Sequence, residues 1–218
     1  MSGPDPSEPT PPEARLVVPD RSFFAVDPVE LAPRLLGAVL AHETADGTVA
    51  VRLVEVEAYR GLGEDPGSHA HRGPTPRTRV MFGEPGRLYA YFTYGMHTCL
   101  NVVGHAPGAA GAVLLRGATV VEGLELARSR RGGASDRDLA RGPARLAVAL
   151  GVPLSASGAD LLAPPFRLLV PAAPPTAVVS TARTGVSGAG GGAAYPWRFA
   201  VAGDPGVSPY RRHARSHD

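Results

Sequence analysis

The stretch from Val49 to Tyr59 constrains the fold of this chain most, because apolar and functional side chains recur there at every second position. Successive side chains of a β-strand point to opposite faces, so the pattern predicts a strand. On one predicted face, aliphatic residues give way to Glu55, Glu57 and Tyr59. Buried carboxylates are costly unless they are paired, so this face indicates a functional site or a strand end that reaches solvent. The strand alone favours the solvent interpretation, and the residues downstream reverse it.

Chain length and cysteine content narrow the class of protein. A chain of 218 residues with 44% hydrophobic residues is expected to form one domain with a full-sized core. The single cysteine, Cys99, excludes an intrachain disulfide framework and a cysteine-built metal site, and it fits a reducing compartment. Neither a membrane-spanning stretch nor a secretory signal is visible. We therefore expect a cytoplasmic protein that does not enter a membrane.

Basic charge is unevenly distributed along the chain. Residues 66–218 contain seventeen arginines and eight acidic residues, whereas the overall net charge is only +2. A basic surface of this kind suits a polyanionic partner. All 22 basic residues are arginine, so no lysine side chain exists to form a Schiff base.

Three segments define the expected domain organisation. Residues 1–14 are rich in Pro, Ser and Glu and lack aromatic residues, which predicts a disordered tail. Residues 15–203 are expected to form the domain, and residues 204–218 a disordered basic tail. The glycine-rich stretch Gly185–Gly192 lacks the Gly-Lys-Ser/Thr ending of a phosphate-binding loop, so we interpret it as a flexible connection.

Capping signals predict three helices. Asp27-Pro28 has the form of a helix start, and leucines at helical spacing extend the predicted helix to about His42. Thr119-Val-Val-Glu122 has the spacing of a capping box and predicts a helix that ends near Arg131. Gly142-Pro143 predicts a third, from Ala144 to Leu150.

Further strands are predicted from alternation and turn signals. Asp46-Gly47 is a hairpin turn that leads into the first strand. Residues 87–95 and 97–103 alternate on either side of Tyr-Gly and predict a second hairpin. Tyr89 and Tyr91 would share one face of it, and Tyr94 would lie at its exposed tip. Such a hairpin could simply pack on the core, but a large exposed ring at a turn usually has a purpose. The remaining predicted strands are 112–116, 166–170, 178–181 and 197–201.

A long polar loop, Gly61–Arg79, follows the first strand. Long loops inside compact domains are usually functional or disordered. The loop contains His69 and His71, but no third ligand lies at a helpful spacing, so no metal site is expected.

Several motifs, taken together, resemble one family of enzymes. The segments that carry the resemblance are Glu55-Val-Glu57-Ala-Tyr59, Ser68-His69-Ala-His-Arg-Gly-Pro-Thr-Pro-Arg77, Met81-Phe82, Tyr89-Ala-Tyr91-Phe-Thr-Tyr94-Gly-Met96, Asn101-Val, Leu114-Leu115-Arg116, Arg141-Gly-Pro-Ala-Arg-Leu and Pro196-Trp-Arg-Phe199. In order and spacing they are similar to the alkyladenine (3-methyladenine) DNA glycosylase family, from about Asp27 to Val201.

The resemblance implies a fold, a partner and a location. The expected fold is a single α+β domain with a curved, mostly antiparallel sheet surrounded by helices. The expected substrate is double-stranded DNA that contains damaged purines, from which a monomeric enzyme releases the base by hydrolysis without a cofactor or a metal. The expected setting is the nucleoid of a bacterial cytoplasm. An enzyme of this kind must first take the damaged base out of the stack into a pocket.

Roles for individual residues follow from the same resemblance. Glu57 would be the general base that activates a water, and Arg116 would hold Glu57 and that water. The base pocket would consist of Tyr59, His69 and Tyr91, with Asn101 rejecting guanine through a clash with its 2-amino group. Tyr94 would insert into the DNA through the minor groove.

Two departures from the family pattern affect the assignment of these roles. The loop between Tyr59 and His69 is one residue longer than the commonest spacing, and His71 stands where another residue is usual. We prefer His69, which follows Ser68 as in the family pattern, and keep His71 as the alternative. The stretch Gly188–Tyr195 is lengthened by glycines and alanines, which leaves its DNA contacts open.

Other charged residues keep two interpretations. Glu55 shares the strand face with Glu57, and we interpret it as a structural carboxylate that supports the site. Arg72, Arg77 and Arg79 either contact phosphate or belong to a solvated loop.

Two other classes of function compete with a DNA glycosylase. A nucleic-acid-binding module without chemistry could use the same aromatic hairpin and basic surface, but Glu57 would weaken its binding to a polyanion. A glycosidase or nucleosidase for small molecules would place paired carboxylates across the scissile bond and would not need an exposed Tyr94.

Overall fold

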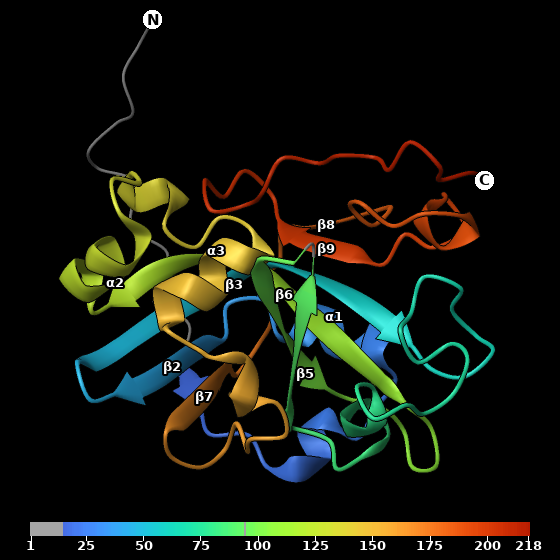
Figure 1. Cartoon of the computed structure of the whole chain (residues 1–218), viewed down its shortest axis with the longest axis horizontal. Helices are drawn as coiled ribbons and strands as arrows, with labels where there is room; N and C mark the ends of the chain where they lie inside the picture. Colours follow the sequence, from blue (N-terminus) through green and yellow to red (C-terminus); the bar gives the residue numbers. More distant parts are fainter. Residues whose placement is uncertain (1–14, 94) are drawn as a thin grey trace, which may run out of the picture.

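The alternating stretch of the sequence forms β3 (Gly47–Arg60), the longest strand of the sheet (Figure 1). The computed structural model describes residues 15–93 and 95–218. Tyr94 and the predicted disordered tail at residues 1–14 lie outside the described residues. The predicted strand between Val49 and Tyr59 is therefore confirmed, with two further residues on its N-terminal side and one on its C-terminal side.

Nine strands build one sheet in the part of the chain that the structure describes, and all paired strands are antiparallel. The sheet has the order β1-β7-β2-β3-β6-β5-β4, and β9 pairs with both β3 and β8. The other strands are β1 (Leu16–Val17), β2 (Val39–Thr44), β4 (Leu88–Thr93), β5 (His97–Val103), β6 (Gly111–Glu122), β7 (Phe166–Pro171), β8 (Val178–Thr181) and β9 (Arg198–Val201). With the helices around it, this sheet confirms the predicted single α+β domain.

Strand β3 changes one of its neighbours halfway along its length, and this change buries its carboxylates. Its first half pairs with β2, from Gly47 to Arg52, whereas Glu55, Val56 and Glu57 pair with β9. Strand β6 accompanies β3 along the other edge, with register shifts around Glu55. The second half of β3 therefore lies between two strands and reaches no solvent at either carboxylate.

Within the described residues, three α-helices pack around the sheet: α1 (Pro28–Arg34), α2 (Leu124–Arg131) and α3 (Pro143–Leu150). Helix α1 packs on β3 and β6, and α3 packs on β5 and β6 (Figure 1). The main apolar core lies at these contacts. Short 3-10 helices occur at Arg21–Phe24, Arg79–Phe82, Asp136–Asp138, Leu154–Ala156 and Ala189–Gly191.

Two predicted helix boundaries were wrong. Helix α1 begins at the Asp27 cap as predicted but ends at Arg34, and His42 lies in β2. Gly37 follows with a φ of 82°, a conformation that glycine adopts easily and that directs the chain back into the sheet. Likewise, Thr119 and Glu122 belong to β6, so they form no capping box, and α2 begins only after Gly123. The predicted end of α2 at Arg131 is confirmed. The third predicted helix is confirmed as α3.

The predicted aromatic hairpin is confirmed as β4 and β5. Tyr89 lies opposite Asn101, and Tyr91 lies opposite Cys99. Asn101 in turn lies opposite Leu114 of β6, so the hairpin joins the sheet beside β6.

Two segments that were expected to be loose lie against the domain instead. In the glycine-rich stretch, Gly190 and Gly191 are buried, and the stretch includes a 3-10 turn, so the flexible connection is corrected to a packed loop. Residues 204–218 also have defined contacts: Ser208 is buried, and the amide of Gly188 donates to the carbonyl of Arg215. The glycine-rich loop and the C-terminal segment pack on each other, so both have defined positions against the domain.

Candidate active site

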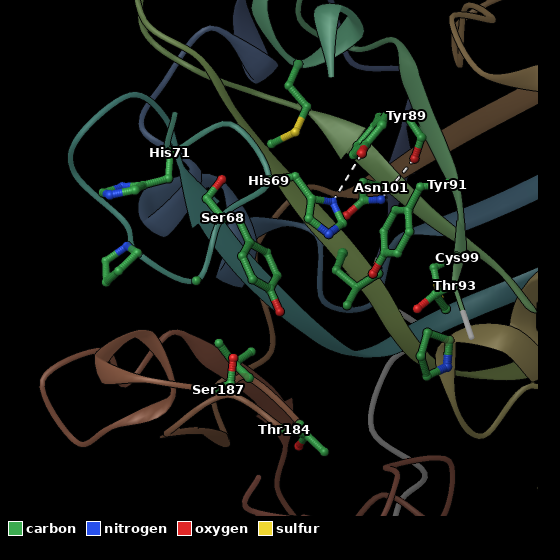
Figure 2. Close-up of a pocket in the computed structure, with 18 of the residues that line it drawn as sticks. Ser68, His69, His71, Tyr89, Tyr91, Thr93, Cys99, Asn101, Thr184 and Ser187 are labelled. Atoms are coloured by element: carbon green, nitrogen blue, oxygen red, sulfur yellow. Dashed lines mark hydrogen bonds between the residues drawn. The ribbon is translucent and has the colours of Figure 1, made fainter. Parts of the chain in front are cut away.

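A pocket of about 800 Å³ opens at the end of β3, between the Gly61–Arg79 loop, the β4–β5 hairpin and residues 184–187. Five residues to which the resemblance assigns catalysis or the base pocket line it: Tyr59, His69, Tyr91, Asn101 and Arg116. Figure 2 shows His69, Tyr89, Tyr91 and Asn101 gathered on one side, with Thr184 and Ser187 across the pocket from them. Segments that lie far apart in the sequence thus form one concave surface.

Glu57 lies directly behind this pocket and has no exposed surface. The Tyr59 hydroxyl donates a hydrogen bond to its Oε2 at 2.8 Å, and the Thr184 amide donates to its Oε1 at 2.6 Å. The Arg116 guanidinium lies 3.4 Å from the same carboxylate. All three of these partners line the pocket, so each contact of Glu57 leads toward it.

Glu55 is equally buried but turns to other partners. Its carboxylate accepts from Arg116 Nε at 3.0 Å and from Arg198 Nε at 2.7 Å. The amide and the hydroxyl of Ser208 donate to it at 2.6 and 3.0 Å. Burial works to raise the pKa of Glu55, but the two arginine charges and Ser208 hold it below its ordinary value of 4.5. Glu55 is therefore an ionised carboxylate whose charge is neutralised by two arginines.

Arg116 links the two carboxylates. It is 7% exposed, lines the pocket, and contacts both Glu55 and Glu57. Burial opposes its charge, but the Glu57 and Glu55 carboxylates raise its pKa above the ordinary value. A permanently charged guanidinium thus stands at the pocket beside Glu57.

Aromatic rings form one wall of the pocket. The Tyr91 and His69 rings meet edge to face with their centroids 4.7 Å apart, and the Tyr89 and Tyr91 centroids are 5.6 Å apart. The Tyr89 hydroxyl lies 3.1 Å from His69 Nδ1 (Figure 2). Tyr59 faces this group from the end of β3. The wall offers flat, apolar faces to a planar ligand.

The wall is electrically neutral at pH 7. Partial burial and the nearby Arg77 charge lower the pKa of His69 to about 4, although the residue as a whole is exposed. Burial and the Glu57 carboxylate raise the pKa of Tyr59 well above its ordinary value, and burial also raises that of Tyr91. Neutral rings beside a buried carboxylate favour a planar ligand that is uncharged or positively charged.

Asn101 lies at the floor of the pocket and is 4% exposed. Its side-chain amide donates to the Tyr89 carbonyl at 2.9 Å, which fixes its orientation (Figure 2). A ligand that enters between the rings therefore meets a fixed polar group.

The arginines of the Gly61–Arg79 loop are exposed, and they differ in their surroundings. Arg72 lines the pocket. The Arg77 guanidinium lies 5.2 Å from the Tyr91 ring centroid and 3.3 Å from His69 Nε2. Arg79 begins a 3-10 helix and has no hydrogen bond or ion pair from its side chain to another described residue. The geometry thus places two of the three beside the pocket.

His71, the alternative to His69, also lines the pocket but stands apart from the aromatic wall (Figure 2). Its Nδ1 is buried and has no hydrogen-bond partner among the described residues. Since His69 contacts Tyr89 and Tyr91, the geometry favours His69 as part of the ring cluster.

A buried ion pair that the sequence did not reveal supports the site. Arg183 and Asp65 are both 0% exposed, and the guanidinium donates to both carboxylate oxygens, at 2.6 and 2.7 Å. Arg183 precedes Thr184, whose amide contacts Glu57. Ser208 was missed as well, because it lay in the predicted tail. No local pattern marks either contact, since the partners are 118 and 153 positions apart.

Neither a metal centre nor a membrane segment appears among residues 15–93 and 95–218. These residues contain no group of three or more His, Cys, Asp or Glu side chains arranged to hold a metal ion. None of the helices described there has both the length and the apolar character needed to cross a bilayer.

The arrangement has a defined chemical capacity. Rings that stack on a planar group, a polar floor and a carboxylate behind the wall are what a hydrolase for a planar leaving group requires. A carboxylate held between an arginine and two hydrogen-bond donors keeps a fixed orientation toward the pocket.

Comparisons with known proteins agree with this geometry. Residues 22–205 match the family model described as methylpurine-DNA glycosylase. A protein of Leifsonia xyli subsp. xyli is 62% identical over 210 residues, which cover 94% of this chain and 98% of the relative. A protein of Streptomyces avermitilis is 53% identical over 198 residues, 88% of this chain and 92% of the relative. Both carry the provisional name 3-methyladenine DNA glycosylase.

Proposed function

Because the chain belongs to the methylpurine-DNA glycosylase family, we propose that it removes damaged purine bases from double-stranded DNA by hydrolysis of the N-glycosidic bond. The observation that carries the proposal is Glu57. It is fully buried, yet all of its side-chain partners line the aromatic pocket. A buried carboxylate beside a concave aromatic surface is costly and suits a general base.

In the proposed reaction, the damaged base leaves the DNA stack and enters the pocket between Tyr59, His69 and Tyr91. Unstacking costs a few kcal/mol, and stacking on these rings offsets that cost. An alkylated purine carries positive charge, which aromatic faces attract, and the neutral His69 does not repel it. The pocket therefore favours a base that is already a good leaving group.

Glu57 acts as the general base in this proposal. It takes a proton from a water molecule, and the water oxygen forms a bond to the sugar carbon while the bond from that carbon to the base nitrogen breaks. The electron pair of the broken bond leaves with the base, and the product is an intact abasic site. Arg116, which contacts Glu57, holds the carboxylate and the water in place.

The free protein covers Glu57 completely, and the proposed reaction needs water beside it. The Tyr59 hydroxyl occupies Glu57 Oε2 at 2.8 Å. We propose that this hydroxyl gives way when the base stacks on the Tyr59 ring, so that water takes its place on the carboxylate. Water then reaches Glu57 only when a base is bound.

Two further residues select and hold the substrate in this proposal. Asn101, fixed by its bond to the Tyr89 carbonyl, rejects guanine through a clash with the 2-amino group. Tyr94 fills the gap left by the flipped base through the minor groove. Arg72 and Arg77, beside the pocket, and Arg79, on the same exposed loop, are available for phosphate contacts.

The absence of lysine from the sequence limits the reaction. Glycosylases that also cut the strand use an amine to form an imine with the sugar, and arginine stays protonated and cannot replace it. We therefore propose that the product strand stays intact. Borohydride added during turnover should trap no covalent protein–DNA adduct, and an adduct that persists after removal of residues 1–14 would contradict this.

Incubation of the protein with short duplexes, each carrying one modified purine, tests the proposed function. Suitable bases are 3-methyladenine, 7-methylguanine, hypoxanthine and ethenoadenine, and chromatography measures the free base. Release of base from at least one duplex, with none from the undamaged duplex, is the expected result. Tight binding without release would favour a nucleic-acid-binding module instead.

A further inference from the structure

Arg183 occupies an unusual position: a fully buried guanidinium at the junction of three segments. It donates to Asp65 in the Gly61–Arg79 loop, to the Ala58 carbonyl of β3 at 2.9 Å, and to the Gly190 carbonyl at 2.7 Å. Its charged carbon also lies 4.4 Å from the centroid of the Tyr59 ring. Ala58 lies between Glu57 and Tyr59 in β3. Arg183 therefore hydrogen-bonds to the backbone between these two residues of the site.

The two loops that meet at Arg183 are in very close contact. A Cβ atom on Gly67 would lie 2.6 Å from Arg183 Nη2 and 2.8 Å from Val186. A Cβ atom on Gly190 would lie 2.7 Å from the Cα of Gly67. Only glycine fits at both positions. The loop that carries His69 can therefore pack directly against the loop that follows Thr184.

Stability alone is a weak reason for this pair. Removing two charges from water costs several kcal/mol per ion, and apolar residues of similar volume often stabilise a protein as well as a buried ion pair does. The guanidinium, however, makes five contacts in fixed directions, which no apolar residue reproduces. A fork of this kind fixes geometry rather than adding much stability.

We propose that Arg183, held by Asp65, is a positioning residue for base release, an inference that rests on the function proposed above. Its anchoring of the chain at Ala58 and Gly190 fixes the adjacent Thr184, whose amide donates to Glu57 Oε1. Its contact with the Tyr59 ring fixes the residue that donates to Glu57 Oε2. Arg183 therefore holds the Thr184 amide, which orients the general base during base release, and the Tyr59 hydroxyl, which covers Glu57 in the free protein, without touching the substrate.

The first test replaces both charges together, as Arg183→Met with Asp65→Asn. This double variant removes the ion pair, keeps the volume, and leaves one acceptor oxygen for the two backbone amides, those of Arg60 and Gly67, that donate to Asp65. Single-turnover base release from a lesion duplex should fall roughly 10²-fold, since small misplacement of a catalytic group has effects of this size. The dissociation constant for the same duplex and the melting temperature should change little.

The control is a second bidentate pair that does not line the pocket. Arg21 donates to both oxygens of Asp160, at 3.1 and 2.7 Å, and neither residue lines the pocket. Arg21→Met with Asp160→Asn should release base at the wild-type rate. A rate loss confined to the Arg183 pair supports positioning, and an equal loss in both double variants overturns it.

Arg183→Lys keeps the inference testable if the double variant does not fold. Lysine retains the buried charge opposite Asp65 but cannot reach Asp65, Ala58 and Gly190 together. Base release should fall at least tenfold with duplex binding retained, and a wild-type rate would overturn the inference. Base release by the wild-type protein in the same assay distinguishes the two hypotheses. If the wild-type protein releases no base, the proposed function fails. If the wild-type protein and the variants release base at equal rates, only the positioning role fails.

Discussion

Glu55 and Glu57 are two residues apart on one strand and equally buried, yet their surroundings differ. Two guanidiniums and both donors of Ser208 surround Glu55. Glu57 shares only Arg116 and otherwise accepts from the Tyr59 hydroxyl and the Thr184 amide. The Glu55 end of the site is thus saturated with charge partners, whereas the Glu57 end is held by neutral donors from the pocket.

This difference separates structural from chemical carboxylates by partner rather than by burial. A carboxylate with two arginines and two further hydrogen bonds has no capacity left to accept a proton at neutral pH. A carboxylate held by neutral donors can exchange one of them for water. Burial identifies both residues as unusual, and only their partners indicate which one faces the reaction.

The largest expected effect comes from Glu57→Gln. Glutamine keeps the shape of the side chain but cannot take a proton from water, so base release should fall by roughly 10²–10⁴. Because the partners of Glu57 are mostly neutral, the folded state should lose little stability. Single-turnover base release, lesion-duplex affinity and the melting temperature measure the three quantities. Near-normal excision by this variant would defeat the proposed mechanism.

Glu55→Gln sharpens the comparison, because it removes the same charge from the same strand. Here the loss leaves Arg116 and Arg198 buried without their common counter-charge, which should destabilise the fold by about 3–5 kcal/mol. Urea unfolding measures the change. If Glu55→Gln instead left stability intact and abolished base release, the assignment of the two carboxylates would have to be exchanged.

The wild-type protein should also show Glu55 in its acid unfolding. The folded-state pKa of Glu55 is lowered from 4.5, so its contribution to stability is present above about pH 4.5 and is lost as the pH falls below that value. The Glu55→Gln variant should lack this part of the pH dependence, which distinguishes a titrating carboxylate from a packing defect.

Much of this site could be predicted from the sequence, because its signals are local. Alternation identified the strand that carries Glu55, Glu57 and Tyr59. It also predicted the tyrosine hairpin, with Tyr89 and Tyr91 on one face. The same local logic failed at Val39 and Leu40, whose spacing suits a helix but whose pairing with β3 decides for a strand. Sheet pairing overrode the helical pattern there.

The supporting contacts could not be predicted, because they join distant segments. Asp65 appeared as one acid among several in a polar loop, and Arg183 as one arginine of many. Ser208 lay in a stretch that composition classed as a tail. Long-range pairing between such residues leaves no periodic pattern in a single sequence, and only the fold brings them together.

A smaller effect is expected at the floor of the pocket. Asn101→Ala should relax the discrimination against purines with a 2-amino group by roughly tenfold or more, as expected when one clash is removed from a binding site. Release of adenine-type lesions should continue, although the lost bond to the Tyr89 carbonyl costs about 1 kcal/mol of stability. Competition between hypoxanthine and guanine duplexes measures the ratio. An unchanged ratio would place the selection elsewhere in the pocket.

The smallest expected effect concerns His69. It extends the comparison of the two carboxylates to a titrating imidazole in the same site. Its folded-state pKa is lowered from 6.5 to about 4, so between these values the unfolded chain holds more protons there than the folded protein. Stability from this residue is therefore complete above about pH 6.5 and declines as the pH falls toward 4. Because His69 is exposed, solvent screening keeps the effect small. In His69→Gln, stability should fall less steeply across this window. NMR titration of the wild-type ring provides the direct check, and a midpoint near 6.5 would mean that the pocket does not keep His69 neutral by burial and Arg77.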